Sequence, residues 1–134
     1  SGPVLIVDDD PDVRRLLEEE LSSAGFAHAS VSGGTQAIVL AARERPSAIL
    51  LDLMMPEPDG FEVLYRIREN TDLKRVPVIV LTAKDLTPGD FERLNGSVQR
   101  IIRKGADMSR LVREVLGTIG VAKMPEGTSP WRAS

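Results

Sequence analysis

Four short strand-like runs, each leading to a polar residue, constrain the fold of this chain more than any other feature. Each run has the length of a buried strand, and a charged group at its end is costly to bury unless it is paired. In chain order the runs cover residues 4–7, 48–51, 78–81 and 98–102, and they lead to Asp8, Asp52, Thr82 and Lys104. Because the carboxyl ends of parallel strands meet at one edge of an open sheet, we expect these four side chains to converge there.

Helical periodicity between these runs predicts an alternation of strands and helices. Asp10 and Pro11 suit the N-cap and the first turn of a helix. The expected strands cover residues 4–7, 27–31, 48–51, 76–81 and 98–102, and the expected helices begin near residues 11, 34, 61, 87 and 108. Five such β–α units predict an α/β fold, doubly wound, with a parallel sheet and helices on both of its faces.

Length and charge limit the class of protein. The 134 residues fit one domain, which we expect to cover residues 4–119. Residues 1–3 resemble a cloning scar, and residues 120–134, which lack periodicity, suggest a tail or linker. A net charge of −3 argues against a general nucleic-acid or membrane-surface binder, and the lack of cysteine excludes disulfides and zinc–thiolate sites. No apolar run approaches the length of a membrane span.

The acidic residues at the strand ends indicate a metal site. Two carboxylates roughly 4 Å apart repel each other by about 4 kcal/mol at an effective dielectric constant of about 20. A divalent cation between Asp8, Asp9 and Asp52 would remove this repulsion, and Mg²⁺ prefers such carboxylate oxygens while keeping several waters. A solvated acidic turn is the alternative for Asp8 and Asp9, whereas Asp10 fits the helix N-cap better than a metal site.

The residue types at these strand ends also suit phosphoryl chemistry. A carboxylate such as Asp52, placed beside Mg²⁺, can attack a phosphoryl group and carry it as an acyl phosphate. The ammonium group of Lys104 would then stabilise charge on the phosphoryl oxygens, and the hydroxyl of Thr82 lies at the end of another of these strands. Taken singly, each residue has an ordinary alternative: a carboxylate bound by backbone N–H groups, a surface lysine and a strand-end hydroxyl. Their shared position at successive strand ends favours the chemical interpretation.

Four segments resemble the CheY-like receiver domain of two-component response regulators. They are residues 4–10, the run Leu-Asp-Leu-Met-Met-Pro-Glu-Pro-Asp-Gly at 51–60, Leu-Thr-Ala at 81–83 and Arg-Lys at 103–104. The resemblance extends over residues 4–119 and implies a flavodoxin-like (βα)₅ fold with strand order 2-1-3-4-5. The implied roles are phosphoacceptor for Asp52, magnesium ligands for Asp8, Asp9, Asp52 and the backbone carbonyl of Met54, and phosphoryl contacts for Thr82 and Lys104.

The resemblance also implies partners for the domain. A histidine kinase or a histidine phosphotransfer domain would supply the phosphoryl group, and an attached kinase or output domain would receive the signal. Residues 81–108 are similar to receivers attached to hybrid sensor histidine kinases. We expect a cytoplasmic signalling domain that catalyses its own phosphotransfer and dephosphorylates slowly, that is not otherwise an enzyme, and that contacts neither nucleic acid nor membrane directly.

Two positions depart from the family pattern. Gly105 replaces the proline that usually follows the lysine, and Ile101 replaces an aromatic residue. We therefore expect a trans Lys104–Gly105 peptide, because a non-proline cis bond costs about 2.5–4 kcal/mol. Ile101 cannot make the aromatic rotation that the family couples to Thr82. We expect the phosphorylation signal to leave instead through the short helix at residues 88–94.

Two other classes of function remain as alternatives. A phosphate-independent protein-interaction module, or pseudo-receiver, would keep the fold without the chemistry, but the five key polar residues are all present. A magnesium-dependent phosphatase with an aspartate nucleophile generally carries a second aspartate two positions later, where this chain has Met54. The signalling receiver is therefore the favoured function.

Overall fold

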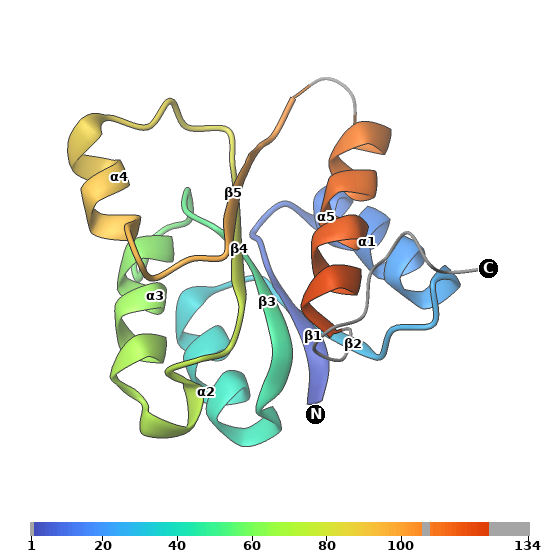
Figure 1. Cartoon of the computed structure of the whole chain (residues 1–134), viewed down its shortest axis with the longest axis horizontal. Helices are drawn as coiled ribbons and strands as arrows, with labels where there is room; N and C mark the ends of the chain where they lie inside the picture. The colour runs from blue at the N-terminus through green and yellow to red at the C-terminus, as the bar shows by residue number, and fades with distance from the viewer. Residues whose placement is uncertain (1, 106–107, 124–134) are drawn as a thin grey trace.

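The fold is a single parallel sheet of five strands. The computed structural model describes residues 2–105 and 108–123. The strand order is β2-β1-β3-β4-β5, which confirms the expected doubly wound α/β fold (Figure 1). The strands are β1 (Gly2–Val7), β2 (His28–Val31), β3 (Pro46–Asp52), β4 (Val78–Thr82) and β5 (Arg100–Arg103).

Helices cover both faces of this sheet. Helices α1 and α5 pack on one face, and α2, α3 and α4 pack on the other (Figure 1). Their bounds are α1 (Pro11–Ser23), α2 (Gly34–Glu44), α3 (Gly60–Glu69), the 3₁₀ turn η1 (Thr71–Leu73), α4 (Pro88–Leu94) and α5 (Met108–Lys123). Asp10 accepts a hydrogen bond from the Asp12 N–H at the start of α1, which confirms the expected N-cap.

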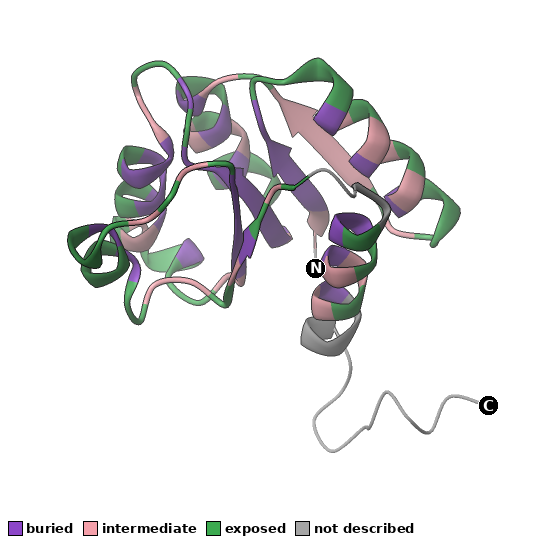
Figure 2. Cartoon of the chain, turned by 90° about the horizontal axis from the view of Figure 1, so that it is seen from above, coloured by how far each residue is buried: buried purple, intermediate pink, exposed green. Residues whose placement is uncertain are grey.

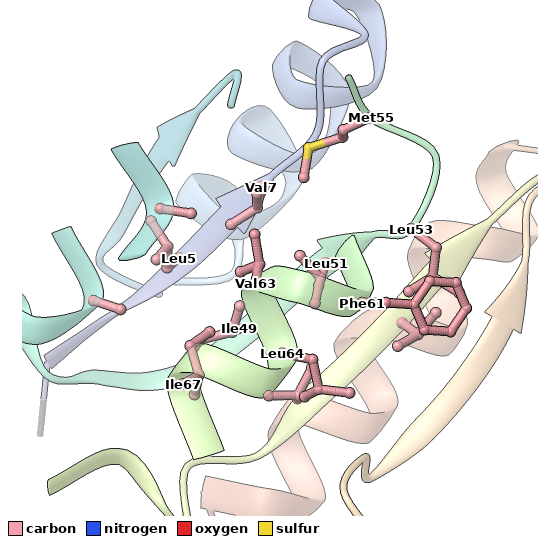
Figure 3. Close-up of a cluster of buried hydrophobic side chains, with 14 of the residues drawn as sticks. Leu5, Val7, Ile49, Leu51, Leu53, Met55, Phe61, Val63, Leu64 and Ile67 are labelled. Carbon is pink, nitrogen blue, oxygen red and sulfur yellow. The ribbon is translucent and has the colours of Figure 1, made fainter. Parts of the chain in front are cut away.

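Side chains that alternate along each central strand build two hydrophobic layers. On β1, Leu5 and Val7 point toward α2 and α3, whereas Val4 and Ile6 face α1 and α5. Figure 3 shows the first layer, in which side chains of β1 and β3 meet the inner face of α3. The central strands are buried on both faces and appear purple in Figure 2, which accounts for their continuous aliphatic sequence.

Several element boundaries differ from the sequence expectation. β3 begins at Pro46, two residues early, because Pro46 pairs with Gly2 of β1. β4 begins at Val78 and β5 at Arg100, each two residues late, because the preceding residues form loops before the strands pair. α5 continues to Lys123, beyond the expected end at residue 119. The rest of the expected tail lies outside the described residues.

The described helices show no membrane-spanning character. Within residues 2–105 and 108–123, no helix combines the length and the apolarity needed to cross a bilayer.

Candidate functional site

The polar residues at or directly after the ends of four strands meet at one edge of the sheet. The register pairs Asp52 of β3 with Leu81 of β4, and the Lys104 backbone N–H donates to the Thr82 carbonyl at 2.8 Å. The Lys104 side chain then reaches back, so that its Nζ lies 2.7 Å from Asp8 Oδ2 and 3.5 Å from Asp52 Oδ2. The convergence expected from the sequence is therefore present.

The carboxylates form a compact acidic cluster. One oxygen each from Asp8, Asp9 and Asp52 lies within 4.8 Å of the others. Asp8 and Asp52 are 1% and 3% exposed, whereas Asp9 is exposed, so the cluster opens to solvent on one side. Asp10 lies outside the cluster, and its backbone N–H donates to Asp8 Oδ1 at 2.9 Å, which orients that carboxylate. Three oxygen ligands at this spacing suit a hard divalent cation.

Asp52 is an unusual carboxyl group. Burial raises its pKa from 3.8 to about 6. The Met54 backbone N–H, which donates to Asp52 Oδ1 at 3.0 Å, opposes this rise, as does the charge of Lys104. The negative charges of Asp8 and Asp9 add to the rise in pKa. Any cation bound at the cluster would favour the ionised, nucleophilic form of Asp52.

Lys104 is the cation that balances the cluster. Its side chain is only 15% exposed, and it contacts two of the three carboxylates. Asp8 and Lys104 are 96 residues apart in sequence, so no local pattern shows that the lysine already offsets the repulsion within the cluster.

Thr82 is buried beside the cluster and connects it to the next loop. Its Oγ1 accepts a hydrogen bond from the Lys84 backbone N–H at 3.0 Å. The Lys84 ammonium in turn pairs with Asp90 of α4 at 3.0 Å. Sequence reasoning missed Lys84, as it missed Arg14, whose Nη1 donates to the Asp8 carbonyl at 2.7 Å. Only the helical position of Arg14, one turn after Asp10, hinted at this contact.

The loop from β3 to α3 explains the spacing of the motif that includes Asp52. Asp59 caps α3 by accepting from the Glu62 N–H at 3.0 Å, and the Gly60 N–H donates to the Leu53 carbonyl at 3.2 Å. A Cβ on Gly60 would lie under 3.0 Å from the Asp52 carbonyl oxygen, which no real Cβ does. A glycine is thus required where α3 begins against the end of β3. Met54, by contrast, is 54% exposed at the rim of the site.

Comparison with known proteins identifies the family. The family model for the response regulator receiver domain matches residues 4–116. The chain belongs to this family.

Relatives of the receiver include regulators and solved receiver structures. It is 31% identical to a probable transcriptional regulator ycf27 of Porphyridium aerugineum, over 90% of this chain and 58% of that protein. It is 34% identical to the receiver domain of sensor histidine kinase PA1611 from Pseudomonas aeruginosa PAO1, with a TM-score of 0.73, over 90% of this chain and 99% of that one. That structure has a magnesium ion coordinated in its active site cleft.

A second solved structure is phosphorylated. The receiver is 31% identical to the phosphorylated cyanobacterial phytochrome response regulator RcpA, with a TM-score of 0.75, over 87% of this chain and 91% of that one. The chain spans little more than half the length of the Porphyridium relative.

The two departures from the family pattern have structural consequences. The Lys104–Gly105 peptide is trans, as expected, and among the described residues the one cis peptide joins Glu57 and Pro58. Ile101 is partly buried and packs against the hydrophobic layer on the α2–α4 face. The receiver therefore has an aliphatic side chain where an aromatic one is usual.

Proposed function

We propose that this receiver accepts a phosphoryl group on Asp52 from a phosphohistidine and thereby regulates a partner or an attached domain. The observation that supports this proposal is the position of Asp52, a buried strand-end carboxylate 3.5 Å from the ammonium of Lys104 and within the acidic cluster. A buried carboxylate with this setting is suited to attack rather than to surface solvation.

The chemistry assigned to Asp52 is an in-line transfer. One carboxylate oxygen attacks phosphorus and forms the new P–O bond, while the bond from phosphorus to the donor imidazole nitrogen breaks. That nitrogen keeps the electron pair and takes up a proton. Asp8, Asp9, Asp52 and the Met54 carbonyl would hold Mg²⁺, which, when bound, neutralises charge on the phosphoryl oxygens.

Lys104 and Thr82 would contact the product. The Lys104 ammonium lies between Asp8 and Asp52, where a phosphoryl group on Asp52 would offer it a stronger anionic partner. The Thr82 hydroxyl, at the end of the adjacent strand, would donate to another phosphoryl oxygen. Both residues would thereby sense the phosphorylated state.

We assign the donor and the output to two-component signalling. The donor would be a histidine kinase or a histidine phosphotransfer domain in the cytoplasm. The signal would pass to an attached kinase or output domain, and the receiver would make no direct contact with nucleic acid or membrane. The relatives named as regulators support this assignment, since the matched receiver is only part of their length.

Phosphorylation by a small donor tests the proposal. Incubation with acetyl phosphate and Mg²⁺ should give a long-lived phosphoprotein, and peptide mapping should place the modification on Asp52. Asp52→Asn should remove the modification and EDTA should prevent it, whereas Asp12→Asn, an exposed helix carboxylate, should leave it unchanged.

Three outcomes would contradict this function. No labelling with Mg²⁺ present would indicate a phosphate-independent interaction module. Continuous release of inorganic phosphate without accumulation of phosphoprotein would indicate a phosphatase. Undiminished labelling of Asp52→Asn would place the acceptor elsewhere.

A further inference from the structure

The outer edge of β2 carries backbone groups that the sheet leaves unpaired. Within the described residues, β2 pairs with β1 alone and ends the sheet. The Val4 N–H donates to the Ala27 carbonyl and the Asp8 N–H donates to the Val31 carbonyl. Successive residues of a strand direct their backbone groups to opposite sides, so the alternate residues, His28 and Ser30, present N–H and C=O groups to the free edge.

A groove of about 600 Å³ runs along this edge. Its lining includes Arg14 of α1 and Arg43 of α2, and it contains no acidic residue among the described positions. Val39 of α2, which is 60% exposed, adds an apolar surface one helical turn before Arg43. Figure 2 shows β2, pink along its length, at the border of the sheet. Two guanidinium groups thus flank the open strand edge; Arg43 also pairs with Glu44 at the surface, at 3.5 Å, and Glu18 accepts from the Ser30 hydroxyl on the α1 side.

We propose that this groove binds an extended acidic segment of a partner protein as an added strand beside β2. The outward backbone groups of Ser30 would pair with the segment, as in other cases of strand addition. Side chains of an added strand alternate between the two faces of the sheet. Acidic residues on the α2 face would meet Arg43, and the alternate aliphatic residues would lie on the α1 face beside the stem of Arg14.

The groove is separate from the acidic cluster but touches its support. Arg14 donates from Nη1 to the Asp8 carbonyl, so a segment that contacts Arg14 is connected to the acidic cluster through this one side chain. The proposal does not depend on phosphorylation of Asp52. A partner held here would be tethered beside the phosphorylation site without covering its solvent-open side.

A designed peptide tests the proposal directly. The probe is a fluorescein-labelled octapeptide of alternating glutamate and valine, and its charge-reversed control alternates lysine and valine. Fluorescence anisotropy should give a dissociation constant below about 1 mM for the acidic peptide at low salt, and the affinity should fall as the salt concentration rises. Amide resonances of Ser30 and its neighbours should shift on binding, and the lysine peptide should not bind.

Paired variants separate the backbone contribution from that of the side chain. Ser30→Pro removes an outward N–H without removing a bond to β1, a change that edge strands tolerate. Ser30→Ala removes the hydroxyl, which donates to Glu18 at 2.8 Å, and keeps the N–H. The proline variant should lose about tenfold in affinity and the alanine variant should not. Arg43→Glu should also weaken binding about tenfold, and circular dichroism should show that all three fold.

Several results would overturn the inference. Equal binding of the lysine peptide would show that charge does not select the occupant. Undiminished binding by Ser30→Pro, or resonance shifts confined to α4 and β5, would place the peptide elsewhere. Concentration-dependent dimers that Ser30→Pro abolishes would assign the edge to a second copy of this chain. If Ser30→Pro fails to fold, the amide shifts of the unmodified protein and the Arg43→Glu variant decide the matter.

Discussion

At the scale of single residues, the burial of Asp52 lowers the stability of the fold when this carboxyl group is ionised. Its pKa is 3.8 in an unfolded chain and about 6 in the fold, so between these values the folded state binds more protons than the unfolded state. The free energy of unfolding therefore falls as pH rises through this window, because ionised Asp52 is the disfavoured form. This rise in the pKa of Asp52 lowers the free energy of unfolding at neutral pH by at most about 3 kcal/mol.

We therefore predict that Asp52→Asn stabilises the metal-free protein. In EDTA at neutral pH the variant should have a higher free energy of unfolding, by up to about 3 kcal/mol, because an amide needs no ionisation in this buried position. The gain should vanish below about pH 3, where Asp52 is protonated in both states. Urea unfolding across pH measures this, with Asp12→Asn as the control. A gain that persists at low pH would show that ionisation of Asp52 is not its source.

At the scale of elements, the contact between β3 and α3 depends on Gly60. Gly60→Ala places a methyl group against the Asp52 carbonyl and the Leu53 Cα, both of which are backbone atoms that cannot move aside. We predict a loss of about 2–3 kcal/mol in unfolding free energy, within the range of overpacked sites. Slower phosphorylation should accompany it, because the end of β3 must shift.

Gly89→Ala is the matched control for this prediction. Gly89 lies in the first turn of α4, and its nearest neighbour to an added Cβ is the Thr87 side chain at 3.7 Å, an ordinary contact. Alanine should be neutral or stabilising by up to about 1 kcal/mol there. Equal effects of the two substitutions on chemical denaturation would contradict the packing argument.

Arg68 of α3 joins three segments of the chain through backbone carbonyls. Its guanidinium donates to Ser97 after α4, and to Leu73, Lys74 and Val76 before β4. Burial lowers the pKa of Arg68, and these hydrogen bonds all go to carbonyl oxygens rather than to a carboxylate. The side chain therefore acts as a clamp between α3, the approach to β4 and the approach to β5.

We predict that Arg68→Met lowers the free energy of unfolding by about 2–4 kcal/mol, because several carbonyls lose a charged donor at once. Arg66→Met on the same helix should cost less than about 1 kcal/mol, since Arg66 is exposed and its ion pair with Glu62 lies at the surface. Urea denaturation of both variants measures the contrast. A loss of similar size in both would show that the carbonyl contacts contribute little.

At the scale of the whole molecule, one chain of contacts leads from the site to α4. Thr82 accepts from the Lys84 N–H, and the Lys84 ammonium pairs with Asp90. Asp90 also completes the capping box of α4. The hydrogen bond that Asp90 accepts from the Thr87 N–H lowers the pKa of Asp90. With Ile101 in place of an aromatic residue, we expect a change at Thr82 to reach α4 through these contacts.

We predict that phosphorylation changes amide hydrogen exchange across residues 85–96. Thr82→Ala and Lys104→Ala should still fold, because neither residue fills a large hydrophobic site, but should lose this change even when Asp52 is phosphorylated. Thr35→Ala, an exposed position on α2, should behave as the unmodified protein does. Mass spectrometry with and without acetyl phosphate measures the exchange. Unaltered exchange in residues 85–96 of the unmodified protein would close this route.

Much of the fold and the site follows from the sequence because its signals are local. The aliphatic runs predict central strands, since only a sheet covered on both faces buries every side chain of such a run. The run after Asp52 is also a local signal, because Asp59 caps α3 and Gly60 lets α3 begin close against the end of β3. Placement of Asp8, Asp52, Thr82 and Lys104 at one edge then follows from parallel pairing.

Other features depend on contacts between residues far apart in the chain. The sequence alone established alternating strands and helices, the acidic residues and their place at strand ends. Only the tertiary structure decided that Lys104 already neutralises Asp8, that Arg68 clamps three segments, and that β2 leaves an arginine-flanked edge open. The physical reason is that local patterns report which face of an element is buried, whereas partners and distances are set by the packing of whole elements against one another.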